Sequence, residues 1–187
     1  MIRKPSKVEL GMLVFGCVML SLCAIFLIIM QVQNKNQAAE YEQHRAELTA
    51  AYQNGTAQEQ MAAALELCFG QNYAVIQNTF ADGTATVVLH AADEPTQNVV
   101  KEYTRDTVFL MSWAFGIPDV EKLSVTFKHT FLDRGGNEVL EDGFVIGISR
   151  ENATDINYEN FANMVWEDPT RLTDRADGYL IIPALRE

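Results

Sequence analysis

Apolar residues dominate one long stretch near the start of the chain, from Val8 to Met30, in which Glu9 is the only charged residue. An α-helix rises about 1.5 Å per residue, so about 20 apolar residues cross a bilayer core about 30 Å thick. The stretch is therefore long enough to span a membrane. We predict a transmembrane helix over residues 8–30, preceded by a short tail at residues 1–7.

Basic residues flank this stretch mainly on its N-terminal side. Arg3, Lys4 and Lys7 precede it, whereas a single Lys35 and then acidic residues follow it. Positively charged flanks of a membrane helix remain in the cytoplasm. We therefore predict a cytoplasmic tail at residues 1–7, and an extracytoplasmic position for everything beyond the membrane helix.

Two other roles of an apolar N-terminal stretch are less compatible with these residues. A cleaved signal peptide has an apolar region of only about 7 to 15 residues and a small-x-small exit, which residues 31–38 lack. A lipoprotein would need a cysteine just after a short apolar stretch, but Cys23 follows Leu22, where a small residue is expected. We favour a retained anchor, in which Cys17 and Cys23 act as small apolar side chains.

Helix-forming residues continue beyond the anchor. Residues 36–53 form a run of good helix formers with a thin apolar stripe, and Asn54-Gly55 breaks it. Thr56-Ala-Gln-Glu59 then matches a capping box that opens a second helix, and Gly70 is placed to end it. We assign residues 31–70 to a helical stalk.

The remaining residues, 71–187, alternate in ways that predict both strands and helices. Residues 73–80 and 84–90 form a first predicted hairpin around Asp82-Gly83. Residues 122–131 and 138–150 form a second hairpin, with a bulge at Asp142-Gly143.

Helical spacing links and follows these hairpins. A long helix is predicted from Asp93-Glu94-Pro95-Thr96 to Gly116, a short one over residues 152–165, and a last extended segment over residues 179–182. This order predicts an α+β domain in which an antiparallel sheet of two hairpins carries helices on one face.

Charge restricts the partners of this domain. The chain has a net charge of −11, and the part beyond the anchor has no cluster of Lys and Arg, which disfavours anionic lipid headgroups and predicts that nucleic acid is not a partner. Cys68 is the sole cysteine beyond the anchor and therefore has no disulfide partner in its own domain. Its apolar surroundings predict a buried thiol.

Catalytic and metal-binding patterns are missing. His44, His90 and His129 lack the spacing of a zinc site, and the acidic turns lack that of a calcium loop. No nucleophile motif and no phosphate-binding glycine loop occurs. We therefore predict no catalytic residues, no metal site and no cofactor. His129 is predicted to be a core-edge histidine with a hydrogen-bond partner.

Two aromatic residues are candidates for contact with a partner. Trp166 lies beside Glu167-Asp168-Pro169, which favours a surface or groove position, and Tyr179 opens the last extended segment. Trp113 lies within the apolar half of the long helix and is predicted to belong to the core.

Five short segments of the C-terminal third carry a resemblance to a known class of domain. They are Asp133-Arg-Gly-Gly-Asn-Glu138, Ser149-Arg-Glu151, Ile156-Asn-Tyr-Glu-Asn-Phe161, Asp177-Gly-Tyr179 and Ile182-Pro-Ala184. Together they resemble the end of extracytoplasmic domains on Gram-positive lipoproteins and membrane-anchored proteins. The resemblance implies a place at the bacterial cell envelope and brings no activity. In topology alone, the predicted order is also similar to assembly subunits of bacterial secretion and conjugation machines.

These observations lead to two hypotheses of function, neither of them enzymatic. The first is a single-pass membrane protein whose extracytoplasmic domain is an interaction or assembly module, with a protein partner or a second copy of itself. The alternative is a domain that binds or senses a small ligand in a cleft between the long helix and the sheet. A pocket lined by Trp113, Phe115 or His129 would favour this alternative.

Overall fold

The structure is a computed structural model that describes residues 7–70, 72–91 and 98–185, with side chains from residue 30 onward except residues 32 and 184. It divides into two units, Met1–Ala46 and Glu47–Glu187. The second is called the compact unit below. The predicted helix start at Asp93-Glu94-Pro95-Thr96 falls on residues 92–97, outside the described residues.

The first helix, α1, runs from Lys7 to Asn54. It ends where Asn54-Gly55 was predicted to break the stalk. Residues 8–29 of the predicted membrane span lie in this helix, and their side chains are outside the described set. Among the residues that are described, no helix combines the length and the apolar character needed to cross a bilayer.

Helix α2, Ala57–Phe69, begins with the predicted capping box. The Thr56 side chain accepts from the Glu59 backbone N–H, and the Glu59 carboxylate accepts from the Thr56 backbone N–H at 2.8 Å. The apolar side of α2 is buried, with Met61 and Leu65 in the core of the compact unit. The segment that we assigned to the stalk, residues 31–70, therefore includes a helix that packs within the compact unit.

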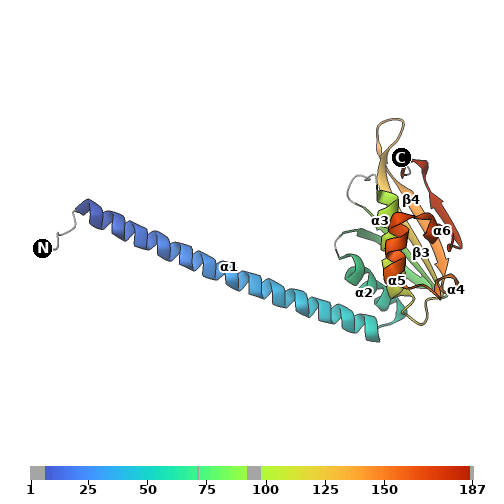
Figure 1. The fold of residues 1–187 in the computed structure, drawn as a ribbon, viewed down its shortest axis with the longest axis horizontal. Coiled ribbons are helices and arrows are strands. Elements are labelled where there is room, and N and C mark those ends of the chain that lie inside the picture. The colour runs from blue at the N-terminus through green and yellow to red at the C-terminus, as the bar shows by residue number, and fades with distance from the viewer. Residues whose placement is uncertain (1–6, 71, 92–97, 186–187) are drawn as a thin grey trace. The chain divides into compact units, whose positions relative to one another are not determined.

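Five strands form one mixed sheet in the order β1-β2-β3-β4-β5 (Figure 1). They are β1 Ala74–Ala81, β2 Thr84–His90, β3 Lys122–Leu132, β4 Glu138–Ser149 and β5 Gly178–Ile181. Both predicted hairpins are present, and the α+β class is confirmed. The expectation of a wholly antiparallel sheet is wrong, because β2 and β3 pair in parallel. Helix α3, Val99–Ala114, lies between these two strands in the chain, and such a crossover returns the chain to start a parallel neighbour.

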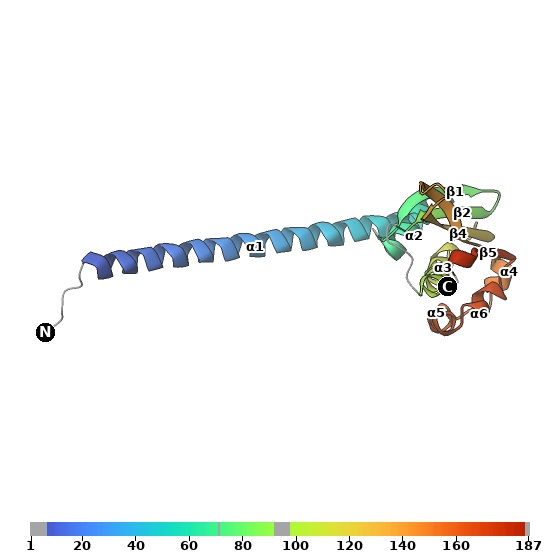
Figure 2. The ribbon, with the colours of Figure 1, turned by 90° about the horizontal axis from the view of Figure 1, so that it is seen from above.

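One face of the sheet carries the core. Val87, Val125 and Ile146 lie side by side on β2, β3 and β4 and are fully buried. Figure 2 shows helices α3 and α5 (Tyr158–Glu167) on one side of the sheet. The buried apolar residues of α3 and α5 belong to the same cluster as Val87, Val125 and Ile146.

The predicted helix over residues 152–165 is divided in the structure. The short α4, Arg150–Ala153, follows β4 directly, and α5 starts at Tyr158. The Asn157 side chain caps α5 by accepting from the Asn160 backbone N–H at 3.1 Å. This local hydrogen bond fixes a new helix start where the apolar spacing alone indicated continuity. Two more short helices follow, α6 Thr170–Thr173 and the 3-10 helix η1 Pro183–Leu185.

The bulge predicted in the second hairpin is confirmed at Gly143. Phe127 pairs with Phe144 and the next residue, Lys128, pairs with Asp142, so Gly143 has no partner on β3. A Cβ at this position would lie 2.9 Å from Cδ1 of Leu185 and 3.2 Å from Cδ2 of His129. Glycine is therefore needed here for space.

Aromatic rings fill the centre of the core. The Phe127 ring stacks on that of Tyr103, with centroids 4.1 Å apart and planes 9° from parallel. Phe144 and Tyr73 approach the same ring edge-on, at 5.9 and 5.3 Å between centroids. Phe127 thus joins β3 to β4, to α3 and to the segment before β1.

Arg150 holds the loop that connects α3 to β3. Its Nη1 donates to the Phe115 carbonyl at 2.8 Å, and its Nη2 donates to the carbonyls of Ile117 and Val120 at 2.6 Å each. Its Nε donates to Val120 as well, at 2.9 Å. One guanidinium therefore binds three carbonyls of the segment between α3 and β3, of which that of Ile117 also accepts from the Val120 backbone N–H at 3.1 Å.

Candidate functional site

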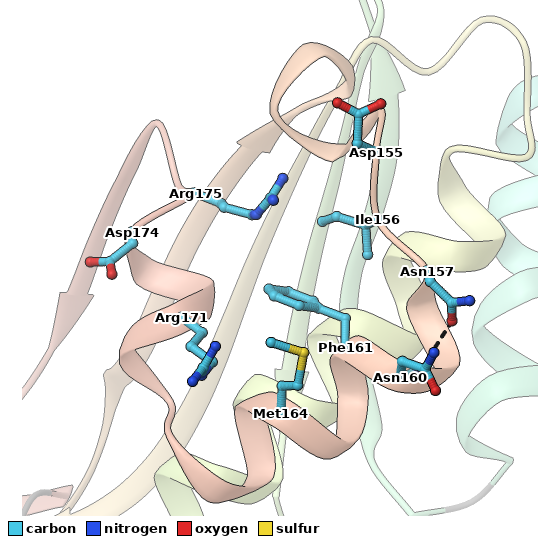
Figure 3. A pocket seen from close by; sticks show the side chains of 9 residues that line it. All are labelled: Asp155, Ile156, Asn157, Asn160, Phe161, Met164, Arg171, Asp174 and Arg175. Atoms are coloured by element: carbon cyan, nitrogen blue, oxygen red, sulfur yellow. Dashed lines mark hydrogen bonds between the residues drawn. The ribbon is translucent and has the colours of Figure 1, made fainter.

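A pocket of about 390 Å³ opens between α5, α6 and the loop that precedes α5 (Figure 3). The loop and α5 provide one wall, and α6 with the turn after it provides the other. The lining residues are Asp155, Ile156, Asn157, Asn160, Phe161, Met164, Arg171, Asp174 and Arg175.

The floor of the pocket is apolar. Phe161 and Met164 are three residues apart on α5 and therefore lie on one face of the helix, and Ile156 joins them from the loop. Phe161 is buried and belongs to the core, whereas Met164 is exposed. The core of the compact unit thus reaches the surface at this point.

Two guanidinium groups stand on the opposite wall. The Arg175 guanidinium lies 5.7 Å from the centroid of the Phe161 ring, and its Nη1 donates to the Asn152 carbonyl at 3.2 Å. Arg171 Nε lies 3.7 Å from the Asp168 carboxylate. Hydrogen bonds from the Thr170 hydroxyl and backbone N–H hold the pKa of Asp168 below its usual value, so this carboxylate stays ionised beside Arg171.

The carboxylates that line the pocket point in a different direction from the Arg175 side chain. In Figure 3, the Arg175 side chain extends across the opening toward Ile156, whereas Asp174 and Asp155 point away from the pocket. The floor of the pocket is therefore apolar, and one of its walls is positively charged. Such a site suits a group that combines an apolar side chain with a carboxylate, because a guanidinium binds a carboxylate through two parallel hydrogen bonds.

Neither predicted interaction residue lines this pocket. Trp166 is half-buried on α5, and the Arg105 guanidinium lies 4.7 Å from its ring centroid. Tyr179 is 53% exposed on β5 and pairs with Ile146 of β4. The structure therefore places one near α3 and the other at an edge of the sheet.

The three residues that were expected to line a ligand cleft, Trp113, Phe115 and His129, have different neighbours in the structure. Trp113 packs edge-on against Tyr52, whose hydroxyl donates to the Trp113 carbonyl at 2.7 Å. Phe115 lies under the Arg150 guanidinium. His129 is buried, with a ring nitrogen against the Tyr103 hydroxyl, and this confirms the predicted histidine with a hydrogen-bond partner. Burial, and then the nearby His90, lower the pKa of His129, which favours the neutral ring.

A polar cluster lies between α2, β1 and α3. The Tyr73 hydroxyl donates to Asp106 Oδ2 at 2.5 Å, and Arg105 Nε lies 3.7 Å from Oδ1. Burial, with a further contribution from Asp106, raises the pKa of the Cys68 thiol to about 12. This thiol is therefore protonated and unreactive at neutral pH, which agrees with a structural role.

Asp106 makes stability depend on pH. Burial raises the pKa of its carboxyl, although the Tyr73 hydrogen bond and Arg105 act in the opposite direction. The folded state then binds the Asp106 proton more tightly than the unfolded state does, so this contribution to stability is present at low pH and is lost as pH rises through the folded pKa. We expect wild type to gain stability relative to Asp106→Asn when pH falls from 7 toward 4.

Urea unfolding of both proteins at each pH measures this difference. Other titrating groups contribute equally to the two proteins, so they cancel in it. A stability difference that is constant over this range would contradict the raised pKa.

The pocket was not predicted from the sequence, although its apolar residues were assigned to a helix. Phe161 and Met164 belong to the helix predicted over residues 152–165, and the segment from Asp168 to Asp177 is one of the acidic turns that lack the spacing of a calcium loop. Arg171 and Arg175 lie within that segment. Their spacing of four residues was the available signal, but it does not show that α6 and the turn after it place these arginines at a pocket beside α5.

Within the described residues, no group of three His, Cys, Asp or Glu side chains could hold a metal ion. Comparison with models of protein families, with curated proteins and with solved structures finds no match to this chain. The functional assignment therefore rests on the geometry of the pocket.

Proposed function

We propose that this chain is a single-pass membrane protein whose extracytoplasmic domain is an interaction module. The α5–α6 pocket is its binding site for a partner segment in which an apolar side chain lies next to a carboxylate. The apolar stretch at residues 8–30 and its basic N-terminal flank support the anchor and its orientation. The pocket, with Arg175 above Phe161, is the observation that carries the binding role.

The lining favours binding over catalysis. Phe161, Met164 and Ile156 offer an apolar surface, and the two arginines are strong hydrogen-bond donors. The side chains of the lining include no thiol, hydroxyl or imidazole that could act as a nucleophile. A partner gains from apolar contact and from charge at the same site, which gives selectivity for acidic, apolar segments.

A small acidic ligand is the second candidate. The volume of about 390 Å³ falls within the range of about 300–1,000 Å³ found for small-molecule sites. N-acetyl-leucine combines one apolar side chain with one carboxylate and tests this candidate directly.

Peptide binding tests the proposal. Fluorescent heptapeptides with a central leucine flanked by Glu, by Gln or by Lys are titrated with the full chain, and binding is followed by fluorescence anisotropy. We expect the Glu peptide to bind most tightly. Arg175→Gln should weaken that binding about tenfold, as expected for the loss of one charge-assisted hydrogen-bonded pair.

Arg134→Gln is the matched control. Arg134 is exposed in the turn between β3 and β4, so its replacement changes the net charge equally but leaves the pocket intact. Equal affinity for the Glu and Lys peptides, or equal loss in both variants, would refute a specific site. Competition by N-acetyl-leucine at micromolar concentration would favour the small-ligand candidate.

A further inference from the structure

Strand β1 is an edge of the sheet, with β2 on one side only. The turn Asp82-Gly83 sets Ala81 opposite Thr84, and in such a hairpin alternate residues turn their backbone groups away from the neighbouring strand. These residues are Phe80 and Asn78. The Gln58 side chain donates to the Asn78 carbonyl at 2.8 Å, which shows that this carbonyl points outward.

Beyond the bulge at Ile76, this edge lacks two common protections against pairing with another strand, charge and proline. Residues 74–81 include no charged residue and no proline, which are the common means of blocking an edge. Val75 and Ile76 are 51% and 49% exposed. The strand is therefore open to a further strand.

The regular part of β1 is short and symmetric about one residue. The register shifts between Val75 and Gln77, so Ile76 forms a bulge, and Asp82 begins the turn. The stretch between them runs from Gln77 to Ala81, and Thr79 is at its centre. Its outward groups, on Asn78 and Phe80, lie at equal steps on either side of Thr79.

We propose that a second copy of this chain pairs with β1, strand against strand and antiparallel, with the twofold axis at Thr79. Asn78 N–H of each copy then donates to the Phe80 carbonyl of the other, and Phe80 N–H donates to the Asn78 carbonyl. That carbonyl has two lone pairs, so it keeps its bond from Gln58. This surface is separate from the α5–α6 pocket, and the proposal does not depend on that pocket.

Charge decides which orientation a second copy can take on β1. Each chain carries a net charge of −11, which opposes self-association over most of its surface, whereas β1 itself is uncharged. Antiparallel pairing about Thr79 separates the two Asp82 carboxylates by six residues, or about 20 Å, well beyond the Debye length of about 8 Å. Parallel pairing would bring these carboxylates together.

Introducing a positive or a negative charge at Thr79, on the proposed twofold axis, tests the proposal. Thr79 is exposed on the sheet face opposite the helices, so Thr79→Lys and Thr79→Glu should both fold. Full chains in lipid nanodiscs or detergent are compared by analytical ultracentrifugation. We expect wild type to dimerise, each variant to dimerise at least tenfold more weakly, and a mixture of the two variants to recover the wild-type affinity.

Disulfide trapping in membranes tests the register. Thr79→Cys should form a linked dimer on oxidation, because opposed residues of this kind have Cα atoms about 4.5 Å apart. Thr86→Cys is the control: Thr86 is the β2 partner of Thr79, and its two copies would be about 14 Å apart. Wild type, with its three cysteines, provides the baseline.

Three results would overturn the proposal. They are a wild-type chain that stays monomeric at 100 µM, a dimer equally stable in both charge variants, and Thr79→Cys linkage no greater than that of Thr86→Cys. Peptide binding at the α5–α6 pocket can succeed or fail without changing any of these results.

Discussion

Phe127→Ala is expected to lower the free energy of unfolding by about 4 kcal/mol, which is the usual cost of removing a buried aromatic ring. Phe127 is fully buried, and its ring contacts Tyr103, Phe144 and Tyr73. These contacts come from three separate segments, so the surrounding structure cannot close the cavity by moving one side chain. Urea unfolding followed by circular dichroism measures the loss.

Thr126→Ala is the matched control on the same strand. Thr126 lies next to Phe127 but points to the opposite face of the sheet, where it is half-buried. Its replacement should cost less than about 1 kcal/mol. If Phe127→Ala cost no more than Thr126→Ala, Phe127 would not be central to the core.

The second large effect is expected at Arg150. Arg150→Ala removes the donors for the carbonyls of Phe115 and Val120, whereas the Ile117 carbonyl keeps its bond from the Val120 backbone N–H. Each carbonyl left without a partner costs about 1–3 kcal/mol, less where water can enter, and the Arg150 side chain is 32% exposed. We therefore expect a loss of about 3 kcal/mol in the free energy of unfolding.

Arg150→Lys separates charge from geometry. Lysine keeps the positive charge, but its single ammonium group cannot reach all three carbonyls in the arrangement that the planar guanidinium allows. It should recover less than half of the loss. Full recovery by lysine would show that charge alone, and not the set of hydrogen bonds, stabilises the loop between α3 and β3.

Local signals in the sequence predicted the elements that depend on neighbouring residues. The capping box at Thr56 and Glu59 opens α2 as expected, and the turn at Asp82-Gly83 joins β1 to β2. The bulge at Gly143 was also visible, because a glycine interrupts a strand pattern there. These features need only residues that are close together in the chain.

The way in which the two hairpins join in the sheet could not be predicted from neighbouring residues. The parallel pairing of β2 with β3 is set by the path of α3 across the sheet, and alternation along each strand is the same for parallel and antiparallel neighbours. The division of the predicted helix over residues 152–165 depends on one side-chain hydrogen bond at Asn157. Neither feature leaves a mark on the hydrophobic pattern.

The candidate site was even harder to predict from the sequence. Trp166 and Tyr179 were selected because aromatic residues often anchor partners, but the structure gives Trp166 a cation contact with Arg105 and places Tyr179 on β5. The α5–α6 pocket arises from the packing of a four-residue helix, α6, whose position no periodicity could predict.

The parallel pairing in the middle of the sheet has a consequence for synthesis on the ribosome. The first hairpin, ending at His90, is complete before any residue of β3 has been made, and its inner strand β2 then lacks a neighbour on one side. The backbone groups on that side of β2 stay unpaired until the chain has grown to Lys128, because Lys122–Lys128 provide their partners. The nascent first hairpin thus exposes an unpaired strand edge during synthesis, and such an edge is prone to aggregation.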